Sequence, residues 1–278
     1  MKKILITLIL FSLFCSFKPQ EFSWVAIGDS ITYLNDHPDE TGFRVSKGYL
    51  TRTIENFPGA NYINKGYNGW TSGNIADHID SLGLVKADIY SVFLGTNDWW
   101  HGRPLGTLAD YENNHGNNSV YSSFRIIINK IRSLNPSAKI VLITPMQRAD
   151  FVYIKDPHNN AYGSYQPKNG QSLEAFANAI DSIGDLEHIA VVDLYHNNQL
   201  KVEKLMKFKR LRDPNTGQYR NYKYPESTGI PFDPAKDEYP YPKEAINLTY
   251  DGLHPSDKGN KIIAKSVTKV FKQLLGSN

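Results

Sequence analysis

Four short stretches of the sequence hold residues that together could perform acyl transfer. Ser30 lies in "AIGDSIT", Gly69 in "NKGYNGWTSG", Asn97 in "VFLGTNDWW", and Asp251 with His254 in "DGLHP". A serine hydroxyl becomes an effective nucleophile when a base accepts its proton, and histidine suits that task at neutral pH. Asp251 precedes His254 by three residues, so its carboxylate could orient the imidazole and stabilise the imidazolium. These residue types point to a serine hydrolase.

Each stretch is a weak signal when it is taken alone. Turns are often rich in Gly, Asp and Ser, and Asp251 with His254 could be a capping pair for the last helix. Asn97 could close an Asx turn, and Gly69 could mark only a backbone position with positive φ. The case for chemistry therefore depends on whether the fold brings the stretches together.

Apolar runs alternate with amphipathic segments along the chain, which predicts alternating strands and helices. Strands are expected over residues 24–27, 61–64, 89–94, 140–144 and 189–194. Helices are expected over residues 49–57, 75–82, 124–134, 173–186 and 257–275, with a short one near 202–208. Strands that are almost entirely apolar and separated by helices indicate a parallel sheet covered on both faces. The predicted fold is α/β, a three-layer α/β/α sandwich with a central five-stranded parallel sheet.

Sites in open parallel sheets form at the carboxyl ends of the strands. Ser30, Gly69 and Asn97 each follow a predicted strand, and Asp251 with His254 directly precedes the last helix. All of them therefore map to one edge of the sheet. This convergence makes a chance combination improbable.

The sequence resembles the SGNH or GDSL hydrolase family over nearly the whole chain after residue 20. Four family blocks occur in order, as Gly28-Asp29-Ser30, Asn64 with Gly69, Gly95-Thr96-Asn97-Asp98, and Asp251 with His254. Ile31 departs from the Leu that many members carry after the serine, but the position stays apolar. The resemblance implies a flavodoxin-like fold with Ser30, Asp251 and His254 as the catalytic residues.

The resemblance also implies an oxyanion hole. Its donors would be the backbone N–H groups of Ser30 and Gly69 and the side-chain amide of Asn97. A glycine suits position 69 because the substrate must approach the backbone closely. We further expect Trp99 and Trp100 to form a wall of the substrate pocket, and Asp98 to brace the loop. His101 could lie near the pocket or be a solvated loop histidine.

Residues 1–20 are expected to be a signal peptide. Lys2 and Lys3 precede the apolar run 4–14, which is too short to span a bilayer. A buried N-terminal element is the alternative. Cys15 ends the run and could be the lipidation site of a lipoprotein signal, although Phe14 is bulky for such a site. The protein is therefore expected to be exported, in the periplasm, at the cell surface or outside the cell.

Residues 21–278 are expected to form one domain. The formal charge of +3 comes from three lysines of the signal segment, and removing residues 1–20 leaves 28 basic and 28 acidic residues. A near-neutral protein gives no support for a nucleic-acid partner. The histidines outside "DGLHP" lack paired ligand spacing, so no metal or other cofactor is expected. Cys15 is the only cysteine, so no internal disulfide can form.

Three long segments interrupt the alternation, at residues 99–118, 150–170 and 197–250. Loops of this length in a compact domain are usually functional. The last segment enters the site edge just before Asp251, so its tyrosines could form part of the pocket wall or could only cover the sheet edge. These tyrosines are Tyr219, Tyr222, Tyr224, Tyr239 and Tyr241, and we assign the first three to the substrate pocket.

The function expected from these features is that of a secreted serine esterase acting on a small-molecule or glycan ester. Segments rich in Tyr, Asn and Pro suit sugar faces better than lipid chains, which favours O-deacetylation of a glycan. The alternatives are a lipase or short-chain acyl esterase, and a catalytically idle carbohydrate-binding relative. Membrane contact is expected only through a lipid anchor at Cys15.

Overall fold

The apolar segments form a five-stranded parallel sheet in the computed structural model, which describes residues 21–113 and 116–276. The strands are β1 (Ser23–Gly28), β2 (Asn61–Gly66), β3 (Ile89–Phe93), β4 (Lys139–Ile143) and β7 (Ala190–Val192). Their spatial order is β2-β1-β3-β4-β7. The predicted fold class is confirmed, and the order is that of flavodoxin-like sheets, in which the direction of winding reverses between β1 and β3.

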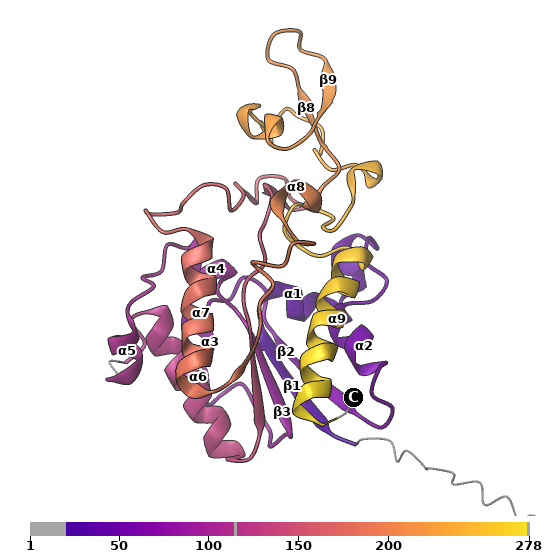
Figure 1. Cartoon of the computed structure of the whole chain (residues 1–278). Coiled ribbons are helices and arrows are strands. Elements are labelled where there is room, and N and C mark those ends of the chain that lie inside the picture. The colour runs from indigo at the N-terminus through magenta and orange to yellow at the C-terminus, as the bar shows by residue number, and fades with distance from the viewer. Residues whose placement is uncertain (1–20, 114–115, 277–278) are drawn as a thin grey trace, which may run out of the picture.

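Two layers of helices cover the sheet (Figure 1). One layer consists of α3 (Ser72–Asp77), α6 (Val120–Leu134) and α7 (Leu173–Glu187), and the other of α2 (Tyr49–Ile54) and α9 (Asp257–Leu274). Alternate residues of β1 explain the two cores: Val25 and Ile27 pack with the first layer, whereas Trp24 and Ala26 pack with the second. Successive side chains of a strand point to opposite faces, so one apolar strand serves both cores.

Helix boundaries follow the capping residues more closely than the apolar pattern. The apolar pattern predicts helix α3 over residues 75–82, but the helix begins at Ser72 because Thr71 and Asn74 form a capping box. It ends at Asp77, and the apolar residues Ile79 and Leu82 enter the core from turns rather than from the helix. Strand β7 is also shorter than the expected 189–194.

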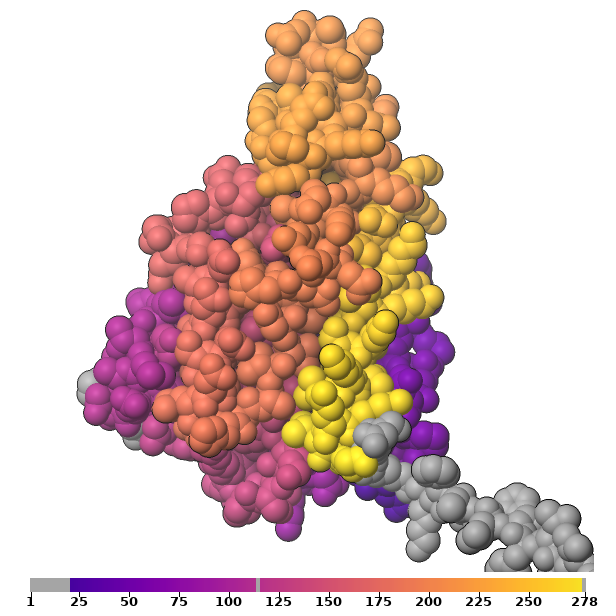
Figure 2. Space-filling model, in the orientation of Figure 1, coloured from indigo at the N-terminus to yellow at the C-terminus, as the bar shows by residue number. Residues whose placement is uncertain are grey.

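The remaining elements lie in the connections. They are α1 (Ser30–Tyr33), η1 (Leu34–Asp36), η2 (Pro38–Thr41), α4 (Thr96–Trp100), α5 (Leu108–Glu112), β5 (Phe151–Val152), β6 (Asn160–Ala161), α8 (Val202–Leu205), β8 (Lys209–Arg212), β9 (Tyr219–Tyr222), η3 (Glu226–Gly229) and η4 (Lys243–Ala245). The β8–β9 hairpin stands away from the sheet as a separate orange lobe (Figures 1 and 2).

The expected signal peptide, including Cys15, lies outside the described residues. Within residues 21–113 and 116–276, no helix has the length and apolar character needed to cross a membrane.

Candidate active site

Ser30 is positioned by the junction between β1 and α1 at the carboxyl edge of the sheet. It is the first residue of α1, and Asp29 caps that helix by accepting a hydrogen bond from the Ile31 N–H at 2.9 Å. The Asp29 carboxyl group is buried, and this burial raises its pKa to about 6. The cap therefore fixes the backbone that presents the Ser30 hydroxyl.

Three side chains from the two ends of the chain form a continuous hydrogen-bonded line. Nε2 of His254 lies 2.8 Å from Oγ of Ser30, and Nδ1 of His254 lies 2.7 Å from Oδ2 of Asp251. Asp251 is 0% exposed, and its Oδ1 accepts hydrogen bonds from the backbone N–H groups of Leu253 and His254. These donors orient the carboxylate, so it can fix the imidazole with Nδ1 protonated and Nε2 free to accept the Ser30 proton.

The turn that carries Asp251 and His254 requires a glycine at position 252. Gly252 has φ +94°, and a Cβ at this position would lie 1.9 Å from the backbone oxygen of Asp150. Only glycine fits both the dihedral and the contact. The carbonyl oxygens of Gly252 and Asp251 accept hydrogen bonds from the backbone N–H groups of Ala149 and Val152, which joins the His254 turn to strand β5.

The residues expected to form the oxyanion hole face the same cavity as Ser30. Gly69 has φ +73°, and a Cβ built on it would meet no atom within 4 Å, so its backbone borders open space. Nδ2 of Asn97 donates to the backbone oxygen of Trp70 at 3.0 Å. One amide N–H thus fixes the side chain, and within the described residues the other has no partner. Ser30, Gly69 and Asn97 line a cavity of about 410 Å³.

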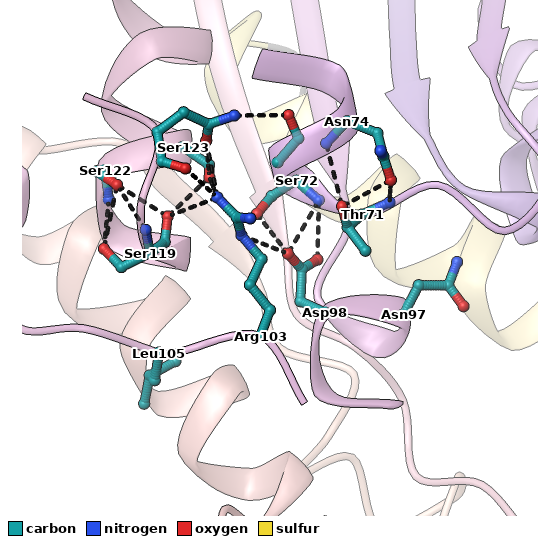
Figure 3. A network of polar contacts seen from close by, with 12 residues as sticks. Thr71, Ser72, Asn74, Asn97, Asp98, Arg103, Leu105, Ser119, Ser122 and Ser123 are labelled. Carbon is teal, nitrogen blue, oxygen red and sulfur yellow. Dashed lines mark hydrogen bonds and ion pairs between the residues drawn. The ribbon is translucent and has the colours of Figure 1, made fainter. Parts of the chain in front are cut away.

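Asp98 belongs to a polar network behind the cavity (Figure 3). Its carboxylate accepts hydrogen bonds from the N–H and the hydroxyl of Ser72 and lies 3.6 Å from Nε of Arg103. Burial raises the pKa of Asp98. Asn97 points away from this network, as Figure 3 shows. The network ties helix α4, which carries Asn97, to helix α3, which follows the Gly69 loop.

The cavity wall differs from the expected one in its tryptophans. Trp100 lines the cavity, but Trp99 is 0% exposed and belongs to the core, where its indole N–H donates to the backbone oxygen of Gln171 at 2.9 Å. The two residues are consecutive in helix α4, so their side chains leave the helix in different directions. The assignment of Trp99 to the pocket is corrected accordingly. His101, for which the sequence left two possibilities, lines the cavity.

Three tyrosines assigned to the pocket do not line this cavity either. Tyr219 and Tyr222 belong to the β8–β9 hairpin, and the Tyr222 hydroxyl donates to Asp213 of the same lobe. Tyr224 lines a different, small cavity beside Tyr165. Tyr219 and Tyr222 form their side-chain hydrogen bonds within residues 212–238, and the hairpin extends away from the sheet edge, which corrects the assignment of the three tyrosines to the catalytic pocket.

The 197–250 segment supports the cavity in another way. Tyr239 and Tyr241 donate to the backbone oxygens of Val152 and Asp150, which flank the cavity residue Phe151. Tyr250, the last residue of the segment, lines the cavity itself. The segment therefore braces one wall and supplies one residue of it.

Sequence reasoning missed several wall residues. They are Leu34, Glu40, Asn68, Arg148, Phe151, Tyr153, Asn159, Ala161, Tyr250 and Leu253. Those from residue 148 to 161 lie in the connection after strand β4, whose exit is at the same sheet edge as the exits of β1 and β3. The position of Arg148 and Phe151 after a buried strand is the signal that could have identified them. In the part of the chain that the structure describes, no group of three or more His, Cys, Asp or Glu residues could hold a metal ion.

A Ser-His-Asp line at the switch point of a flavodoxin-like sheet is an arrangement that serine hydrolases use. The chain belongs to the GDSL-like lipase/acylhydrolase family, whose model matches residues 26–262. Membership in this family supports a hydrolase that acts on esters.

Solved structures agree with this assignment. A possible lipase from Chitinophaga pinensis is 68% identical, with a TM-score of 0.91 over 91% of this chain and 99% of that one. A protein from Lactobacillus plantarum is 17% identical, with a TM-score of 0.60 over 92% and 98% of the two chains. An aryl esterase from M. smegmatis is 12% identical, with a TM-score of 0.50 over 91% and 99%. The last two show the shared fold only. No match to a curated protein was found for this chain.

Proposed function

We propose that the protein is a serine esterase that hydrolyses carboxylic esters through an acyl-Ser30 intermediate. The observation that supports this most directly is the line from Ser30 through His254 to Asp251, with links of 2.8 and 2.7 Å, at the wall of a cavity of about 410 Å³. A carbohydrate-binding relative without activity would not need this alignment, so the geometry favours the enzyme.

The residues divide the reaction into two transfers. Oγ of Ser30 attacks the ester carbonyl carbon while Nε2 of His254 accepts the hydroxyl proton. The carbonyl oxygen becomes an oxyanion, which the N–H groups of residues 30 and 69 and the amide of Asn97 can stabilise. His254 then returns the proton to the departing alcohol oxygen, which leaves the acyl group on Ser30. Water, deprotonated by the same imidazole, releases the carboxylic acid and restores Ser30.

For the substrate we propose an O-acetylated glycan. The cavity wall combines aromatic rings with amide side chains, as in Trp100, Tyr153, Tyr250, Asn68 and Asn159. Such a wall can pack on the face of a sugar ring and bind its hydroxyl groups. Its volume lies within the range of small-molecule sites, roughly 300–1,000 Å³. A short-chain acyl ester or lipid is the second candidate, because Leu34, Phe151 and Leu253 give the cavity an apolar portion. The proposal includes export through residues 1–20.

The test is turnover of p-nitrophenyl acetate by the purified chain and by Ser30→Ala. We expect the variant to lose at least about 10³-fold in kcat while its thermal unfolding is unchanged. Ser133→Ala, a substitution of an exposed serine on α6, is the matched control. Near wild-type turnover by Ser30→Ala would refute the nucleophile. A panel of acetylated glycans and p-nitrophenyl esters of increasing chain length then separates the two substrate classes.

A further inference from the structure

A buried arginine lies in the wall of the catalytic cavity and is not used by the mechanism above. Arg148 is 1% exposed, and its guanidinium carbon lies 5.5 Å from the ring centroid of Trp99, 5.2 Å from that of Trp100 and 6.0 Å from that of Phe151. Trp100 and Phe151 line the cavity together with Arg148. The guanidinium therefore lies among the rings that form this wall.

The donors of Arg148 are not satisfied by the protein. Within the described residues, Nε and Nη2 are buried and have no hydrogen-bond partner. The two carboxylates with the strongest electrostatic effect on Arg148 are Asp251 and Asp150, and both are occupied by other groups. Asp251 binds the His254 turn and imidazole, while Asp150 accepts from the Gly163 N–H, the Tyr165 hydroxyl and Lys209.

An unpaired buried guanidinium is costly. Burial lowers the pKa of Arg148 to about 10, so the group stays charged at neutral pH. Each buried donor without a partner destabilises the folded state, and the penalty is larger when the group is charged. Cation–π contacts with the three rings offset part of this cost but leave the N–H groups without acceptors. An acceptor that enters from the cavity and reaches the guanidinium would reduce this cost.

A second cation lies next to the wall, and together with the unpaired guanidinium it favours an anion as that acceptor. Nζ of Lys168 lies 4.2 Å from the ring centroid of Trp100, and in the described residues it forms no ion pair. Glu40 is the one carboxylate among the described residues that line the cavity, and its oxygens accept from the Tyr33 hydroxyl and, at 3.3 Å, from Asn68. Two cations thus flank Trp100, one in the wall and one beside it, and neither forms an ion pair with Glu40 or another acid of the described residues. A guanidinium offers paired, coplanar N–H groups that match a carboxylate.

We propose that Arg148 is a specificity-determining residue that binds a carboxylate of the substrate, so that the preferred ester belongs to an acidic molecule. This inference rests on the proposed function and narrows its substrate class. If the substrate is a glycan, this inference predicts a carboxylate-bearing sugar or substituent near the acylated oxygen. The alternative, a purely packing role for Arg148 between the rings, would give no preference for charged substrates.

The test compares pairs of esters that have similar shapes, one with a free carboxylate and one without a charge. The first pair is 4-nitrophenyl hydrogen glutarate and 4-nitrophenyl pentanoate, in which the carboxylate lies on the acyl side of the ester. The second pair is 4-acetoxybenzoate and methyl 4-acetoxybenzoate, in which the carboxylate lies on the alcohol side of the acetate ester. We expect the wild-type enzyme to prefer the carboxylate in at least one pair. In Arg148→Met the ratio of charged to neutral kcat/KM should fall about 10- to 100-fold, the loss expected for hydrogen bonds to a charged group.

Two further variants separate direct binding from a general field. Arg148→Lys keeps the charge without the paired donors and should restore only part of the ratio. Lys168→Met removes the charge of the other cation beside Trp100, and an equal fall of the ratio in this variant would overturn the assignment to Arg148. Equal losses on charged and neutral esters in Arg148→Met would also overturn it, because they would indicate a role in folding or in a step common to all esters. The proposal would also be overturned if the wild-type enzyme showed no preference for the carboxylate in either pair. This result does not require Arg148→Met to fold.

Binding without turnover separates this inference from the proposed function. Glutarate and 4-acetoxybenzoate can be titrated into Ser30→Ala, with the fluorescence of the tryptophans as the signal. The same titration is repeated with Arg148→Met added to Ser30→Ala. If the wild type cleaves none of the esters but the added Arg148→Met abolishes binding of the two carboxylates, the esterase proposal fails and the anion site stands. If the esters are cleaved and the ratio is insensitive to Arg148, the esterase stands and the anion site fails.

Discussion

Nε2 of His254 lies 2.8 Å from Oγ of Ser30, although 224 residues separate the two in the chain. Ser30 closely follows β1, whereas His254 lies three residues before the first residue of α9. Helix α9 packs on the opposite side of β1 from α6 and α7, with the Phe271 ring 4.9 Å from that of Trp24. The distance between base and nucleophile thus depends on how α9 packs against the sheet. Core substitutions beneath α9 should therefore affect activity before they unfold the protein.

Replacing Asn97 by Ala should lower kcat by roughly 10²-fold while KM changes much less. The Asn97 amide is fixed by the backbone oxygen of Trp70, and the side chain lines the same cavity as Ser30. A donor that binds the oxyanion acts mainly in the transition state, so its loss appears in kcat. Steady-state kinetics on p-nitrophenyl acetate measures both constants.

Asn97→Asp is the matched variant, because it keeps the shape of the side chain and removes the donor. It should lose at least as much kcat as Asn97→Ala, since a carboxylate would also repel the oxyanion. A rise in KM with kcat preserved would instead place Asn97 in ground-state binding.

The fold and the hydrogen-bonded line could be predicted from the sequence because both depend on local patterns at strand ends. Ser30 and Asn97 closely follow apolar strands, and in a parallel sheet the carboxyl ends of β1 and β3 must be neighbours. The link to His254 needed only the position of the last helix. In each case a few adjacent residues determine where the side chain must lie.

The cavity wall could not be predicted in the same way. Whether Trp99 or Trp100 faces the cavity depends on the helical phase of α4, a five-residue helix with no apolar repeat to reveal it. The β8–β9 tyrosines were assigned from their position in the chain, yet the hairpin pairs with itself and turns away from the site. Arg148 was missed because an arginine in a loop is usually solvated, and only packing shows that its donors are buried.

Asp29 should make the free energy of unfolding depend on pH below neutrality. Burial raises the pKa of its carboxyl group from 3.8 to about 6. Between these values the folded state binds more protons than the unfolded state, so the free energy of unfolding falls as pH rises through this window. Asp29→Asn keeps an acceptor for the Ile31 N–H but cannot ionise. The stability of the wild type relative to this variant should therefore fall by up to about 3 kcal/mol between pH 4 and 7.

Urea unfolding of both proteins at several pH values measures this difference. The other titrating groups are common to both proteins, so subtraction isolates the contribution of Asp29. A difference in unfolding free energy that stays constant from pH 4 to 7 would show that the carboxyl group is not perturbed.

Trp99 and Trp100 offer a test of the corrected cavity wall, because they are adjacent and chemically identical. Trp99→Ala removes a fully buried indole and leaves the backbone oxygen of Gln171 without its donor. It should lower the free energy of unfolding by about 3–5 kcal/mol, as expected for a large-to-small change in a core. Trp100 is partly exposed and lines the cavity, so Trp100→Ala should cost much less stability.

The kinetic effects should be the reverse of the effects on stability. Trp100→Ala removes a ring from the cavity wall and from the surroundings of Arg148, so it should raise KM roughly 10-fold or more for the natural ester. Trp99→Ala, assayed at a temperature where it remains folded, should change KM much less because its indole does not reach the cavity. Urea unfolding and steady-state kinetics on the same two preparations separate the effects. If Trp99→Ala raised KM as strongly as Trp100→Ala, Trp99 would act on the substrate site, directly or through its contacts with Trp100 and Arg148, and the division of roles between the two tryptophans would be wrong.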